Sequence, residues 1–420
     1  MDAFILKGNI IYSENPTTLS VHPESYAVCV DGVSMGVFPE IPARYAALPV
    51  RDYGDSLIVP GLVDLHIHAP QYTFRGSGMD LELMDWLQQQ PFPEEAKFAD
   101  LDYAKAAYSL FARQMKDSAT TRAVVFATRH GAATKILMEE LEKTRLFCFV
   151  GKVNMDSNAP NDLAEDSPEA SMADTLRWLA ETRHLERTKP ILTPRFIPAC
   201  SRPLLEKLGQ LRRETGLPVQ SHLSENPGEI AFVHELFPEE QTYGHCYERY
   251  GLLEGAVMAH CVYSEAAEVA LLKEKGVFVA HCPASNTNLS SGIAPIWRYL
   301  EQGIHVGLGS DVAGGHTESI FRAMADAVGV SKLYWRLADP ECRPLRMPEA
   351  FYLATKGGGA FFGKVGSLEE GYAFDALVLD ETAMPRWNSL NLLQRLEQFI
   401  YLEQGRNSLK AKFAAGNQIF

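Results

Sequence analysis

The middle of the chain alternates short, nearly continuous apolar runs with longer segments in which apolar residues recur at helical spacing. Short apolar runs are typical of strands buried on both faces of a parallel sheet, and the longer segments are typical of the helices that connect such strands. The runs lie at residues 57–68, 123–127, 146–153, 191–197, 218–222, 256–260, 277–281 and 305–308. The intervening helices are predicted at residues 101–116, 134–144, 168–187, 203–215, 228–236, 264–275 and 295–302. Eight parallel strands with crossover helices predict an α/β fold, the TIM-like (β/α)8 barrel, which carries its functional residues at the C-terminal ends of the strands.

The two ends of the chain have a different pattern. Short β-like segments separated by turn-rich pieces fill the first 56 residues, and residues 376–380 have the same character. We therefore expect residues 1–56 and 365–420 to form one small β domain. Residues 57–364 would then form the barrel.

Composition narrows the class of protein. The 420 residues are 46% hydrophobic, which is enough for a large core. The formal net charge of −14 argues against binding to nucleic acid or to an anionic membrane surface. A small molecule is therefore the expected partner.

The cysteines and the apolar segments bear on location. Seven cysteines, odd in number, are widely spaced and mostly set in apolar runs, which is typical of buried thiols in a reducing compartment. No segment reaches the roughly 18 apolar residues of a membrane-spanning helix, and the first residues lack the pattern of an export signal. We expect a cytoplasmic protein that does not enter a membrane.

Candidate metal ligands end or follow the predicted strands. The first run closes on His66-Ile67-His68, and because side chains alternate between the faces of a strand, both imidazoles point the same way. Further candidates at other strand ends are His222, His260, His281 and Asp311. Three imidazoles and one carboxylate suit Zn²⁺, with Fe²⁺ as the alternative, and the metal would lower the pKa of a bound water.

Glu225 is the candidate acid and base. It follows His222 by three residues, so a turn just past the strand end can bring its carboxylate over the metal-bound water. We expect it to carry protons between water and substrate. The alternative is a charge that is stabilised by a helix N-terminus.

The fourth strand bears on the number of metal ions. Binuclear hydrolases of this architecture commonly bridge two metals with a carboxylated lysine on that strand. Lys152 falls on the predicted third strand, whereas the fourth ends in Arg195, whose guanidinium stays protonated and binds no metal. One metal ion per chain is therefore expected.

Three further residues suit a flat heterocycle with polar edges. Arg195 can present its guanidinium to a carbonyl, Phe196 offers an aromatic face, and the amide of Gln71 both donates and accepts. The alternatives are a structural ion pair for Arg195 and barrel packing for Phe196. The segments at residues 74–93 and 154–168 are candidates to cover such a pocket.

Taken in order, these motifs resemble the guanine deaminases of the amidohydrolase superfamily over nearly the whole chain. The H-x-H pair and the Ser-Asp after the eighth strand are common to the superfamily and indicate a metal-dependent hydrolase. The other motifs are more specific. They are HAPQ (residues 68–71), GKVNMD (151–156), PRF (194–196) and HLSEN (222–226).

The resemblance implies a role for each matching residue. A single zinc would be held by His66, His68, His222 and Asp311. Glu225, His260 and Asp311 would act in catalysis, with Glu225 moving protons and His260 hydrogen-bonding the attacking water. The substrate-binding residues would be Gln71, Arg195, Phe196, His222 and Glu225, with Arg195 near the six-position oxygen of a purine. Guanine would be hydrolysed to xanthine and ammonia, and the protein would be a homodimer.

Two alternatives remain at this point. A related aminohydrolase would act on 8-oxoguanine, a triazine or a thioadenosine, because pocket details separate these enzymes more than metal ligands do. A non-catalytic scaffold of the dihydropyrimidinase-like type would keep the barrel but lose metal ligands, and here the set is complete. His281 could support the purine site from behind.

Overall fold

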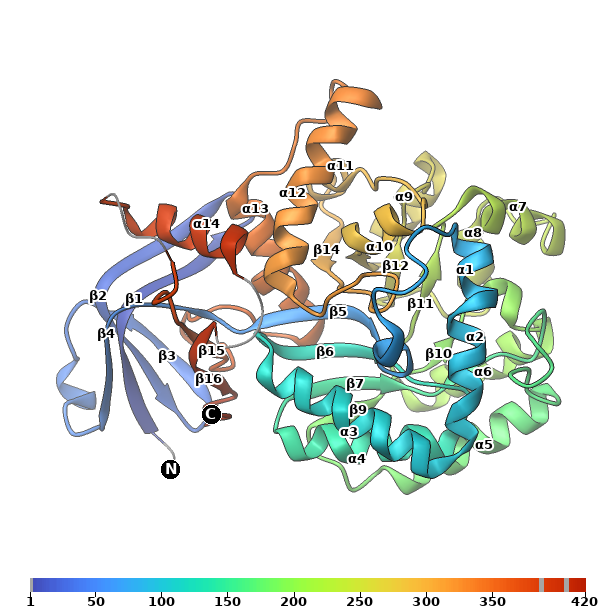
Figure 1. Ribbon diagram of the computed structural model, residues 1–420, viewed down its shortest axis with the longest axis horizontal. Coiled ribbons are helices and arrows are strands. Elements are labelled where there is room, and N and C mark those ends of the chain that lie inside the picture. Colours follow the sequence, from blue (N-terminus) through green and yellow to red (C-terminus); the bar gives the residue numbers. More distant parts are fainter. Residues whose placement is uncertain (1–2, 385–388, 404–407) are drawn as a thin grey trace.

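A computed structural model describes residues 3–384, 389–403 and 408–420, and its strands fall into parallel and mixed sheets (Figure 1). One parallel sheet contains, in order, β5 (Leu62–His68), β6 (Thr120–Phe126), β7 (Phe147–Gly151) and β9 (Thr188–Pro190). A second contains β11 (Gln220–Leu223), β12 (Val257–His260), β13 (Phe278–His281) and β14 (His305–Leu308). Between them, β8 (Val153–Asn154) pairs in parallel with β10 (Thr193–Pro194). Each of the eight predicted runs contains a strand, and the α/β fold with parallel sheets is confirmed.

The two parallel sheets also meet along backbone hydrogen bonds. Leu192, between β9 and β10, forms an isolated parallel bridge with Val219, which directly precedes β11. Just after β14, the Asp311 N–H donates to the carbonyl of His66 (2.8 Å), and the His68 N–H donates to the carbonyl of Val312 (3.1 Å). The C-terminal ends of β5 and β14 therefore lie side by side.

Helices connect the strands and cover the parallel sheets (Figure 1). Those at predicted positions are α3 (Leu101–Asp117), α4 (Gly131–Thr144), α5 (Pro168–Glu181), α6 (Arg202–Thr215), α7 (Pro227–Leu236), α9 (Ala266–Glu274) and α11 (Ile296–Glu301). The others are α1 (Leu83–Gln89), α2 (Pro91–Ala96), α8 (Tyr243–Arg249), α10 (Pro283–Asn288), α12 (Ile320–Leu337), α13 (Met347–Tyr352) and α14 (Leu392–Leu402). Within the described residues, no helix combines the length and apolar character needed to cross a membrane.

One predicted helix is too long at its C-terminal end. Helix α5 ends at Glu181, not at residue 187. The Glu142 carboxylate on α4 accepts the backbone N–H groups of Glu186, Arg187 and Thr188, so these residues are held outside the helix. A side chain that is remote in the sequence thus fixes the backbone of residues 186–188 after α5 has ended.

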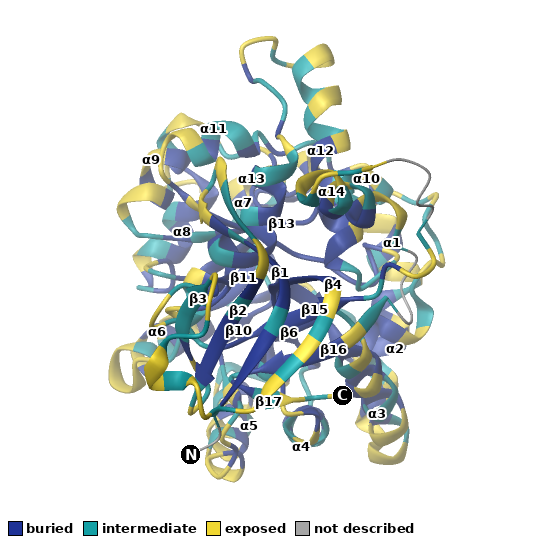
Figure 2. Ribbon diagram, turned by 90° about the vertical axis from the view of Figure 1, so that its left-hand side faces the viewer, coloured by how far each residue is buried: buried dark blue, intermediate teal, exposed yellow. Residues whose placement is uncertain are grey.

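A seven-stranded sheet combines strands from both ends of the chain. Its order is β17-β16-β15-β4-β1-β2-β3, and Figure 2 views the molecule from the side of this sheet. The strands are β1 (Ala3–Asn15), β2 (Thr18–Val30), β3 (Val33–Phe38), β4 (Val50–Pro60), β15 (Ala376–Leu379), β16 (Leu409–Ala414) and β17 (Asn417–Gln418). Strands β1 and β4 are parallel, and the other pairs are antiparallel.

The first predicted run, residues 57–68, is divided between the two kinds of sheet. Its first part belongs to β4 of the seven-stranded sheet, and β5 begins only at Leu62. Gly61 lies between them, where an added Cβ would stand 2.2 Å from the Oγ1 of Thr121. The expectation of one continuous barrel strand is therefore wrong: the chain passes from one sheet to the other at Gly61, where β6 leaves no room for a side chain.

Two buried charged side chains tie the seven-stranded sheet to the parallel strands. Arg122 on β6 donates through Nε (2.7 Å) and Nη2 (3.2 Å) to the two oxygens of Asp375. Lys412 on β16 is fully buried and donates to three carbonyls at the end of α3, those of Met115, Lys116 and Ser118. All seven cysteines are buried, as the apolar setting of most of them predicts.

Candidate active site

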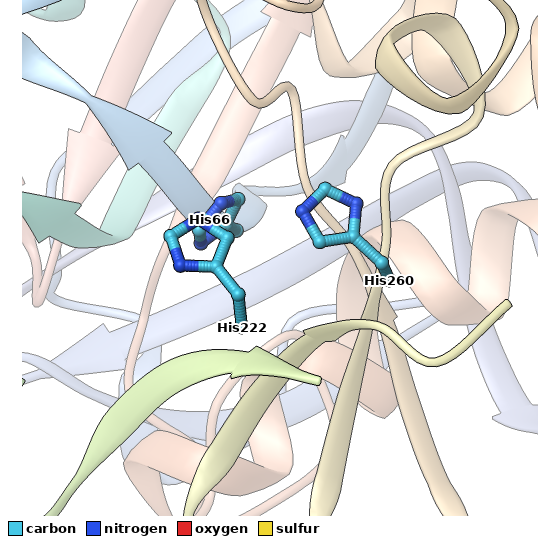
Figure 3. Close-up of side chains that lie close together, drawn as sticks. All are labelled: His66, His222 and His260. Carbon is cyan, nitrogen blue, oxygen red and sulfur yellow. The ribbon is translucent and has the colours of Figure 1, made fainter. Parts of the chain in front are cut away.

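Histidines from separate strands meet at the C-terminal ends of the parallel sheets. Figure 3 shows the rings of His66, His222 and His260 gathered at one point, from β5, β11 and β12. The Nε2 atom of His68 lies 3.2 Å from that of His66 and 3.3 Å from that of His222. The Oδ1 atom of Asp311 lies 3.1 Å from His66 Nε2 and 3.4 Å from His68 Nε2. The candidate ligands are therefore brought together from distant parts of the chain.

These distances fit a single metal ion. Ligand atoms bound to a tetrahedral zinc at about 2.0–2.1 Å lie about 3.3 Å from one another. The Nδ1 of His222 lies 2.6 Å from the carbonyl of Arg195, which can only accept, so the N–H must be on Nδ1 and Nε2 is left with a free lone pair. Burial lowers the pKa of His68 to about 4 and holds that of His222 well below its usual value, so both rings are neutral and able to bind a metal.

Glu225 lies beside this cluster, just past the end of β11. Its Oε1 accepts a hydrogen bond from Ser291 Oγ (2.8 Å), and its Oε2 lies 3.4 Å from Nε2 of His260. Burial, and then the charge of Asp311, raise the pKa of Glu225 to about 8. A carboxyl group with a pKa near neutrality can both accept and donate a proton at physiological pH.

The backbone at these strand ends adopts an uncommon conformation. The φ angle is positive at Ser224 (48°), His260 (75°), Cys261 (49°) and Asp311 (46°). Residues other than glycine rarely adopt this backbone conformation. Residues that adopt it cluster at functional sites, where the surrounding structure must hold them. Uncommon backbone conformations therefore mark the same strand ends that carry the candidate metal ligands.

A cavity opens beside the cluster, with about 510 Å³ of empty volume that is partly open to solvent. His68, His222, His260, Asp311 and Glu225 lie at its polar end. Gln71, in the short 3-10 helix Ala69–Phe74, also lines it, as do Arg195 and Phe196, which follow β10. The proposed metal ligands and substrate-binding residues therefore line this cavity, except His66, which lies in the histidine and aspartate cluster but not on the cavity wall.

Helix α1 forms an apolar wall of the cavity. It contributes Leu83, Met84, Trp86 and Leu87, all within the segment at residues 74–93. No described residue of the segment at 154–168 lines this cavity. The sequence shows α1 only as a short apolar pattern, so its place over the site depends on packing.

Two other polar residues singled out in the sequence lie outside the cavity. His281 is buried at the end of β13, and burial lowers its pKa to about 3; its Nδ1 has no hydrogen-bond partner among the described residues. Lys152 forms a buried ion pair with Glu165, which also accepts the N–H of Met155. Lys152 therefore has a structural partner away from the histidine cluster.

Glu95 is a buried residue that no sequence pattern connects with the site. Both of its oxygens bind side chains that line the cavity, Gln71 and Arg195. In the sequence it stands beside Glu94, and no pattern distinguishes the two. Only the structure shows that Glu95 faces the site, whereas Glu94 bonds to Thr73, Lys97 and Tyr103.

Parallel strands that carry histidines and an aspartate at their C-terminal ends are typical of metal-dependent hydrolases. Residues 57–411 match the amidohydrolase family, and the chain belongs to this family. Among curated proteins, it is 37% identical to guanine deaminase of Dictyostelium discoideum (88% of this chain, 84% of that protein) and 36% identical to guanine deaminase of Homo sapiens (86% and 82%). A crystal structure of guanine deaminase from C. acetobutylicum with bound guanine superposes with a TM-score of 0.96 at 43% identity, covering all of both chains. The resemblance to guanine deaminases is confirmed.

Proposed function

We propose that this protein hydrolyses guanine to xanthine and ammonia. The observation that carries the proposal is one cavity in which Gln71, Arg195 and Phe196 lie next to the histidine and aspartate cluster. The similarity to guanine deaminases over most of the chain supports the same reaction. These relatives are named as enzymes, which argues against a non-catalytic scaffold.

The cofactor in this proposal is one Zn²⁺, held by His66, His68, His222 and Asp311. Neutral imidazole nitrogens and one carboxylate suit zinc, with Fe²⁺ as the alternative, and His66, His68 and Asp311 have ligand atoms 3.1–3.4 Å apart, with His222 3.3 Å from His68. When bound there, the ion would supply a Lewis acid that makes water a usable nucleophile near neutral pH.

Glu225 moves the protons in this reaction. It takes a proton from the water as its oxygen attacks C2 of guanine, and passes that proton to a ring nitrogen. Glu225 then moves the second proton of the water to the amino group. The bond between C2 and the amino nitrogen breaks, ammonia leaves, and C2 becomes a carbonyl carbon. The Nε2 of His260 lies 3.4 Å from Glu225 and forms a hydrogen bond with the attacking water.

The purine is oriented by the cavity wall. Arg195 donates to the six-position oxygen, Gln71 bonds a polar edge of the ring, and Phe196 lies against its face. The apolar side chains of α1 exclude water from the other face. His222 and Glu225 border the reacting carbon.

The larger architecture in this proposal follows from the same family. The parallel strands form a closed (β/α)8 barrel within residues 57–364, and residues 1–56 with 365–420 form the small β domain. The protein works in the cytoplasm as a homodimer. The bonds from Asp311 and His68 across β14 and β5 support the closure.

The test is ammonia release from zinc-loaded protein that is offered guanine, 8-oxoguanine, adenine, cytosine and thioadenosine side by side. The metal content of the same sample is measured in parallel. A clear preference for guanine with about one metal per chain is the expected result, because a mononuclear site with an open position is the catalytic arrangement. Preference for another ring would refute guanine as the substrate, and two metals per chain would refute the mononuclear site.

A further inference from the structure

We propose that Glu95 is a positioning residue that orients Gln71 and Arg195 and neutralises the charge of Arg195, so that the cavity selects uncharged rings over anionic ones. The inference rests on the proposed function for the identity of the ring. It goes beyond that function by assigning a specificity-determining role to a residue outside the cavity wall.

The first observation is that Glu95 uses both oxygens on two cavity residues. Its Oε1 accepts from Gln71 Nε2 (3.0 Å) and from Arg195 Nη2 (3.1 Å), and its Oε2 accepts from Arg195 Nη1 (2.5 Å). Glu95 itself is only 1% exposed, on the short helix α2. One buried carboxylate therefore joins the two side chains that would read the polar edges of a purine.

The second observation is that these bonds decide which way the Gln71 amide points. A carboxylate only accepts hydrogen bonds, so the Nε2 of Gln71 must face Glu95. On the other side, the Oε1 of Gln71 accepts the backbone N–H of Ala313 (3.2 Å). The amide is thus held at both ends, and one N–H and one lone pair remain for a ligand.

The third observation concerns charge. The Arg195 side chain is 4% exposed, its guanidinium cannot lose its proton, and its one ion pair within the described residues is with Glu95. The paired guanidinium still has three of its five N–H groups for a ring oxygen. Because the pair is neutral, it can bind the carbonyl of guanine without attracting an anion strongly.

This pairing matters for product release. Xanthine is a stronger acid than guanine, so part of the product is a monoanion at mildly alkaline pH. An unpaired buried guanidinium would hold that anion in the cavity. The Glu95 carboxylate repels it, and so favours a neutral substrate over its more acidic product.

The test compares the binding of two purines to zinc-loaded wild type and to Glu95→Gln by calorimetry. At mildly alkaline pH most xanthine is anionic, whereas hypoxanthine is still largely neutral. We expect the affinity ratio of xanthine to hypoxanthine to rise about tenfold or more in Glu95→Gln. For guanine, kcat/KM should fall about 10- to 100-fold, because Gln71 and Arg195 lose their fixed orientation.

Three further variants separate positioning from general damage. Glu95→Asp keeps the charge, so its xanthine-to-hypoxanthine ratio should remain that of the wild type even where kcat/KM falls. The double variant Glu95→Gln, Arg195→Gln removes both charges, so its xanthine-to-hypoxanthine affinity ratio should return toward the wild-type value. It leaves no buried charge unpaired, so it can be measured even if Glu95→Gln alone is unstable. Glu94→Gln is the matched control, since it makes the same change on the same helix at a residue that bonds elsewhere.

An unchanged ratio in Glu95→Gln, an increase of equal size in Glu94→Gln, or no measurable xanthine binding to any variant would overturn the role of Glu95. Failure of the proposed function has a different signature. A wild type that does not deaminate guanine refutes that function, while the binding ratios still decide whether Glu95 controls the charge of the ligand.

Discussion

Replacing Glu225 by glutamine is the most direct test of the proton-transfer role. The amide keeps the volume of the side chain. Its oxygen can still accept the hydrogen bond from Ser291 Oγ, which lies 2.8 Å from Oε1 of Glu225 in the wild type. It cannot take up or release a proton. A positioned acid and base contributes about 10²- to 10⁴-fold to a rate, so kcat should fall by that factor, or about 3–5 kcal/mol in activation free energy at 1.36 kcal/mol per decade.

The assay measures kcat for guanine and zinc content on the same preparation. Zinc should remain near one per chain in Glu225→Gln, because Glu225 is not among the four proposed ligands. Glu268→Gln is the matched control: Glu268 is also buried and accepts from a serine, Ser224, but lies outside the cavity. A kcat within a few-fold of wild type in Glu225→Gln, or a loss of zinc, would refute the reasoning.

Changes at Ser291, at the metal, at Phe196 and at Lys412 should each have a distinct effect. Ser291→Ala removes the hydrogen bond that lowers the pKa of Glu225, so this pKa should rise and the acid limb of the pH profile of kcat/KM should move to higher pH. The control is Ser109→Ala, which removes a hydrogen bond to Glu140 on α4 and should leave the pH profile unchanged. Chelation of the metal should abolish turnover and lower the melting temperature, because an ion that binds only the folded state stabilises it by mass action, and zinc should restore both; an unchanged melting temperature would argue against the site. Phe196→Leu should raise KM for guanine about 5- to 10-fold through lost stacking, with little change in kcat, and an unchanged KM would remove Phe196 from the pocket. Lys412→Met should lower the free energy of unfolding in urea by about 3 kcal/mol, since three buried carbonyls lose their donor, whereas exposed Lys410→Met should change it by less than about 0.5 kcal/mol.

The sequence predicted most of what lies along single strands. Strands in parallel sheets are buried on both faces, so each appears as a short apolar run, and His66, His68, His222 and His260 could be placed because they end such runs. The C-terminal ends of neighbouring parallel strands meet at one edge. The local sequence pattern was therefore sufficient to predict that these histidines lie at one site.

What the sequence did not predict depends on contacts between distant segments. Glu95 contacts Gln71 and Arg195, and the apolar side chains of α1 line the cavity, only because α1 and α2 pack over the strand ends. The apolar run is divided at Gly61, where Thr121 leaves no room for a side chain, and Glu142 on another helix holds residues 186–188 outside α5. The partners in both contacts are distant in the sequence.

The seven-stranded sheet has a consequence for how the chain is made. In β4, Ile58 and Val59 pair with Val378 and Leu377, and Ser34 donates to the carbonyl of Leu368, 334 residues further on. During synthesis, β4 therefore emerges from the ribosome as an open, apolar sheet edge and stays open until β15 has been translated. Such edges are sites of aggregation, so ribosome stalling or truncation before residue 376 should yield chains that depend on chaperones to remain dispersed.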